Sequence, residues 1–145
     1  MRIAKTVSLA LALSFGGVAS AEDLIHATMY KNPYCDCCEG HAEYLRQNGF
    51  DVEIKVVEDL ISMQRAQGVP EELDGCHMIV IDGMVVEGHV TAPIIRKLLN
   101  ERPAGVVGIS IPGMPTGVPG MPGTKEGPVD IYAFGQGKTT VFAVE

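Results

Sequence analysis

Three cysteines stand within four residues, Cys35-Asp36-Cys37-Cys38, between an apolar stretch and a segment of helical character. Cys35 and Cys38 form a C-x-x-C pair, and such a pair after a strand and before a helix is a moderately specific sign of thiol chemistry. Backbone N–H groups and the helix dipole stabilise a thiolate there, and the thiolate is both the nucleophile of disulfide exchange and the metal-binding form. We therefore expect a strand that ends at the cysteines and a helix that begins there.

The hydrophobic pattern predicts the order strand, helix, strand, helix, strand, strand, helix. The predicted strands cover residues 24–30, 50–57, 78–81 and 84–86, and the predicted helices cover residues 39–48, 59–67 and 92–102 with Thr91 as N-cap. This is the order of the thioredoxin fold, a βαβ unit followed by a ββα unit, whose first helix begins at its cysteines. The expected fold class is α/β and thioredoxin-like.

Residues 103–128 differ in composition, since they hold six of the nine prolines and seven of the 17 glycines. Because proline cannot donate to a strand ladder, this Pro/Gly/Met-rich window is predicted to be a loop, neither a regular helix nor a central strand. A C-terminal hairpin is predicted beyond it, from residues 129–134 and 139–144.

The first 21 residues have the composition of a secretory signal. Basic residues stand at the start, an apolar stretch follows, and Ala19-Ser20-Ala21 is an A-x-A cleavage site. The apolar stretch is short for a bilayer span, although an uncleaved anchor is the alternative. We expect a removed signal at residues 1–21, a single metal-binding domain at residues 22–145, and no stable membrane insertion.

Export changes the charge of the chain. All 18 acidic residues follow residue 21, whereas two of the 11 basic residues precede it, which leaves nine basic residues and a net charge of −9. Nucleic acid and anionic lipid bind basic patches, so this charge argues against both as partners.

An oxidising compartment also favours disulfides, and four cysteines allow three complete pairings. Two structural disulfides are therefore one reading of the chain. The spacing argues against it, because Cys37 and Cys38 are adjacent and a Cys35–Cys38 link closes almost no loop.

Cys37 favours a soft-metal site, because a simple dithiol oxidoreductase needs no third thiol and Cu(I) prefers thiolate and thioether ligands. On an ideal helix Cys37 points away from the face that Cys35 and Cys38 share. Either the segment is not fully helical there, or Cys37 serves a different edge of the site. Cys76 stands just before the third strand, beside the C-x-x-C turn of a thioredoxin-like layout, so all four sulfurs are expected to converge. The alternative is that Cys76 is a small buried hydrophobe.

Histidines and methionines are further candidate ligands. His89 follows the predicted hairpin and has a glycine beside it, which allows close backbone approach. His77 and His41 are each open to two interpretations, ligand or structural residue. Met114 and Met121 stand in matching Pro-Gly-Met-Pro turns, where two thioethers suit soft-metal capture, or where each packs into the core.

The motifs of the chain are Tyr30-Lys31-Asn32-Pro33-Tyr34-Cys35-Asp36-Cys37-Cys38, Gly49-Phe50-Asp51-Val52, Cys76-His77, Glu87-Gly88-His89-Val90 and Gly113-Met114-Pro115. Together they resemble the CopG-like copper-resistance proteins, formerly known only as a bacterial domain of unknown function. The resemblance covers nearly the whole exported chain.

The resemblance implies a periplasmic, thioredoxin-like protein of copper resistance with a C-x-C-C copper site. It also implies a role in interconverting Cu(I) and Cu(II), which would make the protein a copper oxidoreductase. The crowded thiols themselves favour several Cu(I) ions in the site, and we expect Cys35 and Cys38 to be the redox pair. Its partners would be copper ions and other periplasmic copper-handling or redox proteins. The implied copper ligands are Cys35, Cys37, Cys38, Cys76, His89, Met114 and Met121.

Two other functions stay open at the level of the sequence. A thiol–disulfide oxidoreductase acting on exported proteins would need only Cys35 and Cys38. A zinc site with cysteine and histidine ligands is the third interpretation.

Overall fold

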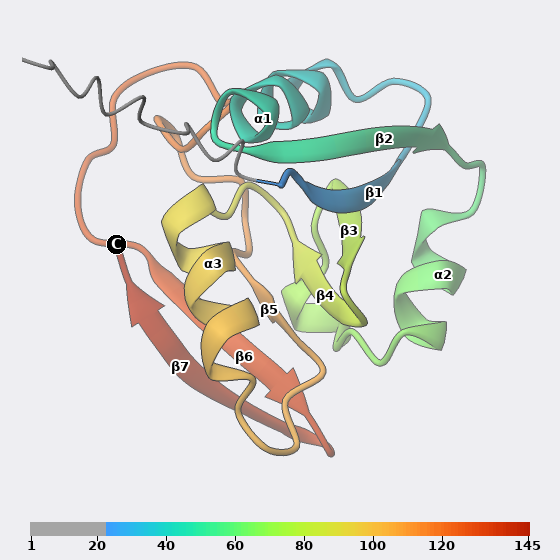
Figure 1. Ribbon diagram of the computed structural model, residues 1–145, viewed down its shortest axis with the longest axis vertical. Helices are drawn as coiled ribbons and strands as arrows, with labels where there is room; N and C mark the ends of the chain where they lie inside the picture. Colours follow the sequence, from blue (N-terminus) through green and yellow to red (C-terminus); the bar gives the residue numbers. More distant parts are fainter. Residues whose placement is uncertain (1–22) are drawn as a thin grey trace, which may run out of the picture.

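The computed structural model describes residues 23–145, so the predicted secretory signal lies outside the described residues. Figure 1 shows the elements along the chain. They are β1 (Ile25–Lys31), α1 (Asp36–Gln47), β2 (Phe50–Val56), α2 (Leu60–Ala66), a 3-10 turn (Glu71–Leu73), β3 (His77–Ile81), β4 (Met84–Glu87), α3 (Ala92–Glu101), β5 (Gly108–Ser110), β6 (Asp130–Gly135) and β7 (Lys138–Val144).

These strands form one sheet in the order β2-β1-β3-β4-β5-β6-β7. The pairs β1–β2 and β4–β5 are parallel, and the other neighbours are antiparallel. With α1 between β1 and β2 and α3 after β4, the first part of the chain has a βαβ unit followed by a ββα unit. The predicted α/β, thioredoxin-like fold class is confirmed.

Local sequence explains where the elements begin. In β2 the apolar Phe50 and Val52 are buried and Asp51 between them is exposed, as the period of a strand requires. At the start of α2 the backbone N–H of Ser62 donates to Asp59 Oδ1 at 3.0 Å, which is an N-cap bond.

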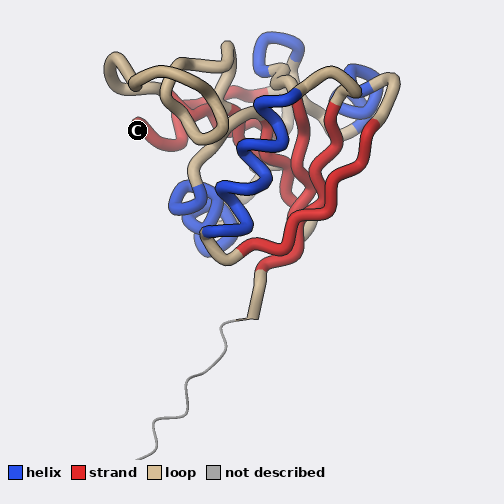
Figure 2. The backbone as a smooth tube through the Cα atoms, turned by 90° about the horizontal axis from the view of Figure 1, so that it is seen from above, coloured by secondary structure: helices blue, strands red, loops and turns tan. Residues whose placement is uncertain are grey.

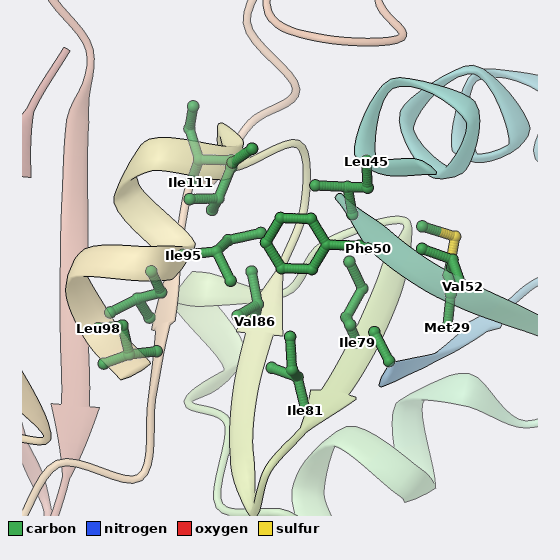
Figure 3. Packing of buried hydrophobic residues seen from close by; sticks show 14 of the residues in the cluster. Met29, Leu45, Phe50, Val52, Ile79, Ile81, Val86, Ile95, Leu98 and Ile111 are labelled. Atoms are coloured by element: carbon green, nitrogen blue, oxygen red, sulfur yellow. The ribbon is translucent and has the colours of Figure 1, made fainter. Parts of the chain in front are cut away.

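Apolar residues pack on both faces of the sheet. The larger cluster joins α1 and α3 to one face, and Figure 3 shows the Phe50 ring between Leu45 of α1 and Ile95 of α3. The smaller cluster lies on the opposite face, where Leu60 of α2 packs with Met78 of β3. The cysteine segment at the start of α1 belongs to the larger cluster, so the site lies against the apolar core.

The prediction that residues 103–128 hold no central strand is wrong, because β5 lies between β4 and β6. A proline excludes a ladder hydrogen bond only at its own position, and residues 104–111 contain none. Gly108 is required there, since a Cβ at this position would lie 2.3 Å from the Val85 carbonyl oxygen. The buried Ile109 and Ser110 complete the strand.

The rest of the window is the predicted loop, the long tan segment near the C-terminus in Figure 2. It docks on α1 by close backbone approach, because a Cβ at Gly40 would lie 3.1 Å from the Gly120 Cα. The predicted C-terminal hairpin follows it as β6 and β7. Among the described residues, none of the helices combines the length and apolar character that crossing a membrane requires.

Candidate metal centre

The cysteine cluster lies at the N-terminus of α1. Cys35 is the N-cap residue, and Cys37 and Cys38 lie in the first helical turn. The Cys35 side chain makes no capping hydrogen bond. The helix N-terminus therefore offers its backbone N–H groups and its positive dipole end to whatever charge the sulfurs carry.

All four sulfurs converge. Cys35 and Cys38 form a disulfide, while Cys37 and Cys76 are free thiols. The Cys37 sulfur lies 3.6 Å from that of Cys35, and the Cys76 sulfur lies 3.5 Å from that of Cys38. The four Sγ atoms lie within 4.8 Å of one another.

Cys37 lies within the helix and still contacts the other cysteines. Its backbone is helical, yet its thiol reaches the Cys35 sulfur, because Cys35 precedes the helix and is extended. Cys37 therefore serves a separate, partly exposed edge of the site, whereas Cys38 is fully buried.

The sheet brings Cys76 to the other cysteines. β3 begins at His77, whose register partner in β1 is Lys31, so Cys76 lies at the sheet end from which β1 leads to Cys35. Gly75 permits this placement, since a Cβ there would lie 2.6 Å from the Gly88 backbone nitrogen.

Three buried histidines lie behind Cys76. The ring centroids of His41, His77 and His89 are 4.8 to 5.1 Å apart. Two of them face the Cys76 sulfur, which lies 3.4 Å from His77 Nδ1 and 3.3 Å from His89 Nε2. His89 Nδ1 donates to the Pro119 carbonyl at 2.7 Å, so neutral His89 presents the lone pair of Nε2 to the sulfur.

Burial sets the protonation of these groups. It raises the pKa of the Cys76 thiol to about 12, with a smaller contribution from the neighbouring Cys37. Burial lowers the pKa of His41 to about 4 and also lowers the pKa of His89. The pKa of His77 lies well below its ordinary value through burial and repulsion from the other two imidazoles, opposed in part by the Gly88 carbonyl. At neutral pH the centre thus combines neutral imidazoles with a protonated Cys76.

Met114 and Met121 take different positions. Met114 is 45 % exposed and lines an open pocket of about 540 Å³ together with Cys35, Cys37 and Cys76. Met121 is partly buried and packs against the main core cluster. The two matching turns therefore present one thioether at the mouth of the site and one beneath the loop.

Two charged residues near the centre are absent from the sequence-based candidates. Lys31 is 3 % exposed, and its Nζ donates to the Cys35 carbonyl and pairs with Glu39, both at 3.1 Å. Glu87 is fully buried and accepts from Gln64 Nε2 at 2.9 Å, and burial raises its pKa to about 8. Charged residues in strand segments that otherwise read as core were the available signal for both.

Fold and site together define a thioredoxin-like protein with a cysteine-rich centre able to hold a soft metal ion. Residues 73–121 match the family described as "Protein of unknown function, DUF411". Two solved structures, "Copper resistance protein copG- Form 1" and "Form 2", are each 35% identical with a TM-score of 0.77. Each match covers 84% of this chain and 98% of the other. No curated protein matches significantly. The chain belongs to the CopG-like family.

Proposed function

We propose that this protein is a periplasmic copper-binding protein of copper resistance that holds Cu(I) in its cysteine-rich site. The observation that carries the proposal is the convergence of four sulfurs from two distant segments within 4.8 Å. Cu(I) prefers thiolate and thioether ligands, and adjacent sulfurs can bridge several ions. The similarity to solved copper-resistance proteins supports copper as the metal.

In this proposal the thiolates of Cys35, Cys37, Cys38 and Cys76 are the main ligands. His89 adds a nitrogen donor, since its Nε2 lone pair already faces the Cys76 sulfur. The thioether of Met114 adds a soft donor at the pocket mouth. Met121 could join only if the loop moved, because it packs against the core.

The proposal includes a redox step. The thiolates of Cys35 and Cys38 each give one electron to one Cu(II) ion, a bond forms between their sulfurs, and two Cu(I) ions result. The Cys35–Cys38 disulfide in the structure corresponds to the oxidised product of this step. After the two Cu(I) ions leave, a dithiol reductant of the same compartment would reduce the disulfide and be oxidised to a disulfide itself. In the reverse step the disulfide would take one electron from each of two Cu(I) ions, which gives two thiolates and two Cu(II) ions.

The cellular setting belongs to the same proposal. Residues 1–21 would direct export and be removed, and residues 22–145 would form one metal-binding domain in the periplasm. Other periplasmic copper-handling or redox proteins would exchange copper or electrons with it. Mass spectrometry of the periplasmic fraction, showing a chain that begins at Glu22, tests this part.

Anaerobic titration of the fully reduced protein with Cu(I), in competition with a chromophoric chelator, tests the site. We expect several equivalents to bind, and we expect Cys37→Ser and Cys76→Ser each to lose most of them. His26→Gln is the control, because His26 is exposed and lies outside the centre. Binding of one equivalent or none by the unmodified protein would contradict the proposal.

A thiol–disulfide oxidoreductase is the second candidate. The Cys35–Cys38 disulfide at a helix N-terminus, with Cys35 lining the open pocket, favours it. Reduction of a disulfide-bonded substrate that persists in both Cys37→Ser and Cys76→Ser would support this candidate. Loss of that reduction in either variant would favour copper chemistry.

A further inference from the structure

His41 is fully buried, and its two ring nitrogens are hydrogen-bonded to groups other than the cysteine sulfurs. It lies on α1, three residues after Cys38. Its Nε2 is 2.9 Å from the Val90 carbonyl oxygen, and its Nδ1 is 2.8 Å from His77 Nε2. His41 therefore links the helix that carries the cysteines to the first residue of β3.

The Val90 carbonyl determines the tautomer of His41. A carbonyl oxygen only accepts, so His41 Nε2 carries the proton and, in the neutral ring, Nδ1 has a lone pair. His77 Nε2 must then donate to His41 Nδ1. Because His77 is also neutral, its own Nδ1 is left unprotonated, and that atom faces the Cys76 sulfur at 3.4 Å.

His89 reaches the same outcome by an independent route. Its Nδ1 donates to the Pro119 carbonyl, which leaves the Nε2 lone pair 3.3 Å from the Cys76 sulfur. Two backbone carbonyls from different segments thus orient two unprotonated nitrogens toward one thiol. The site has a nitrogen face as well as a sulfur face, and the nitrogen face depends on hydrogen bonds made on the far side of each ring.

We propose that His41 is a positioning residue that holds His77 in the tautomer whose unprotonated Nδ1 faces Cys76, and so makes His77 a nitrogen donor for the metal centre. The copper consequence rests on the proposed function, but the tautomer does not. Hydrogen-bond partners behind a ligating histidine typically contribute about 10–100-fold to metal affinity.

The first test is long-range ¹H–¹⁵N NMR spectroscopy of the reduced, metal-free protein, purified in the form that remains after export. We expect the spectrum of a protonated Nε2 and an unprotonated Nδ1 for His77. His41→Gln should preserve this pattern, because its amide can donate to Val90 and its oxygen can accept from His77. His41→Leu removes the acceptor, so His77 should shift toward the Nδ1-protonated form. A protonated His77 Nδ1 in the unmodified protein, or an unchanged tautomer in His41→Leu, would overturn the proposal.

The second test measures Cu(I) affinity with the chromophoric chelator. We expect His41→Leu to weaken binding about 10–100-fold and His41→Gln to restore most of the loss. In a His77→Ala background the His41→Leu change should have little further effect, because His41 acts through His77. An equal loss in both backgrounds would show a merely structural role and overturn the proposal. The expected tautomer without any copper binding would refute the proposed function and leave His41 as the residue that orients His77.

Discussion

Cys76 differs from an ordinary surface thiol in the environment of its sulfur. Two imidazole nitrogens and the sulfurs of Cys37 and Cys38 surround it, and burial keeps it protonated at neutral pH. Metal capture at this residue must therefore release a proton. In the proposed function the same residue would be an unreactive thiol without metal and a ligand with it.

We predict that Cys76 is alkylated slowly by iodoacetamide at about pH 8, because the thiolate is the nucleophile and the pKa of Cys76 is about 12. In the disulfide form only Cys37 and Cys76 are free, so mass spectrometry can follow each site. Cys37→Ser should speed the reaction of Cys76, since Cys37 contributes to the raised pKa. Alkylation of Cys76 at the rate of a free cysteine would contradict the burial argument.

Single residues also show what the sequence could not reveal. The place of Cys76 follows from element order, since a residue just before β3 must lie beside the end of β1. The linked rings of His41 and His77 could not be predicted, because they depend on side-chain packing between α1 and β3. For Lys31 the sequence shows a charged residue at the end of a strand, but not its partner, because that partner is the backbone carbonyl of Cys35 at the helix N-cap.

At the scale of elements, the long loop is part of the candidate metal centre. Its Pro119 carbonyl orients His89, and Gly120 lies against α1 between the cysteines and His41. The loop prediction from proline and glycine content is confirmed for most of residues 103–128, but it missed the short strand β5. Composition averages over a window, whereas a strand needs only a few consecutive residues with free ladder groups.

We predict that Gly120→Ala damages both stability and the centre. Gly120 has φ of +84°, and a Cβ there would lie 2.5 Å from the backbone nitrogen of His41 and 2.7 Å from the carbonyl oxygen of Cys37. The left-handed backbone costs about 1–2 kcal/mol with a side chain, and the clash adds about 1–3 kcal/mol. Urea denaturation and Cu(I) titration measure the two effects.

Gly123→Ala is the matched control for that variant. Gly123 has a similar φ of +88°, but a Cβ there would lie 3.5 Å from its nearest neighbour, the Thr116 Cβ. It should show the backbone cost and leave copper binding intact. Equal losses in the two variants would mean that the contact between loop and α1 does not matter.

For the whole molecule, buried ionisable groups predict how stability depends on pH. His41, His77 and His89 have lowered pKa values in the folded protein. As the pH falls below 6.5, these histidines therefore bind more protons in the unfolded chain than in the folded one. Stability that is present above that pH is lost on acidification, by up to about 1.4 kcal/mol per pH unit for each neutral histidine. Glu87 acts oppositely, since its raised pKa means that stability is lost as pH rises toward about 8.

We therefore expect the metal-free disulfide form to be most stable near pH 6.5 within the range of about pH 4.5 to 8. The three histidines outweigh Glu87 on the acid side, and Glu87 acts alone among these groups on the alkaline side. Urea midpoints across this range measure the curve. Glu87→Gln should flatten the alkaline side and steepen the acid side, because Glu87 opposes the histidines there. An unchanged alkaline slope in that variant would contradict the assignment.

The position of Met114 has a consequence for how the protein responds to oxidants. Met114 is the one exposed methionine of the part that the structure describes, and it stands at the mouth of the pocket. Oxidants convert an exposed thioether to a sulfoxide, which is polar and no longer a soft donor. The chain would therefore carry a chemical record of oxidative exposure at Met114, which methionine sulfoxide reductase would erase.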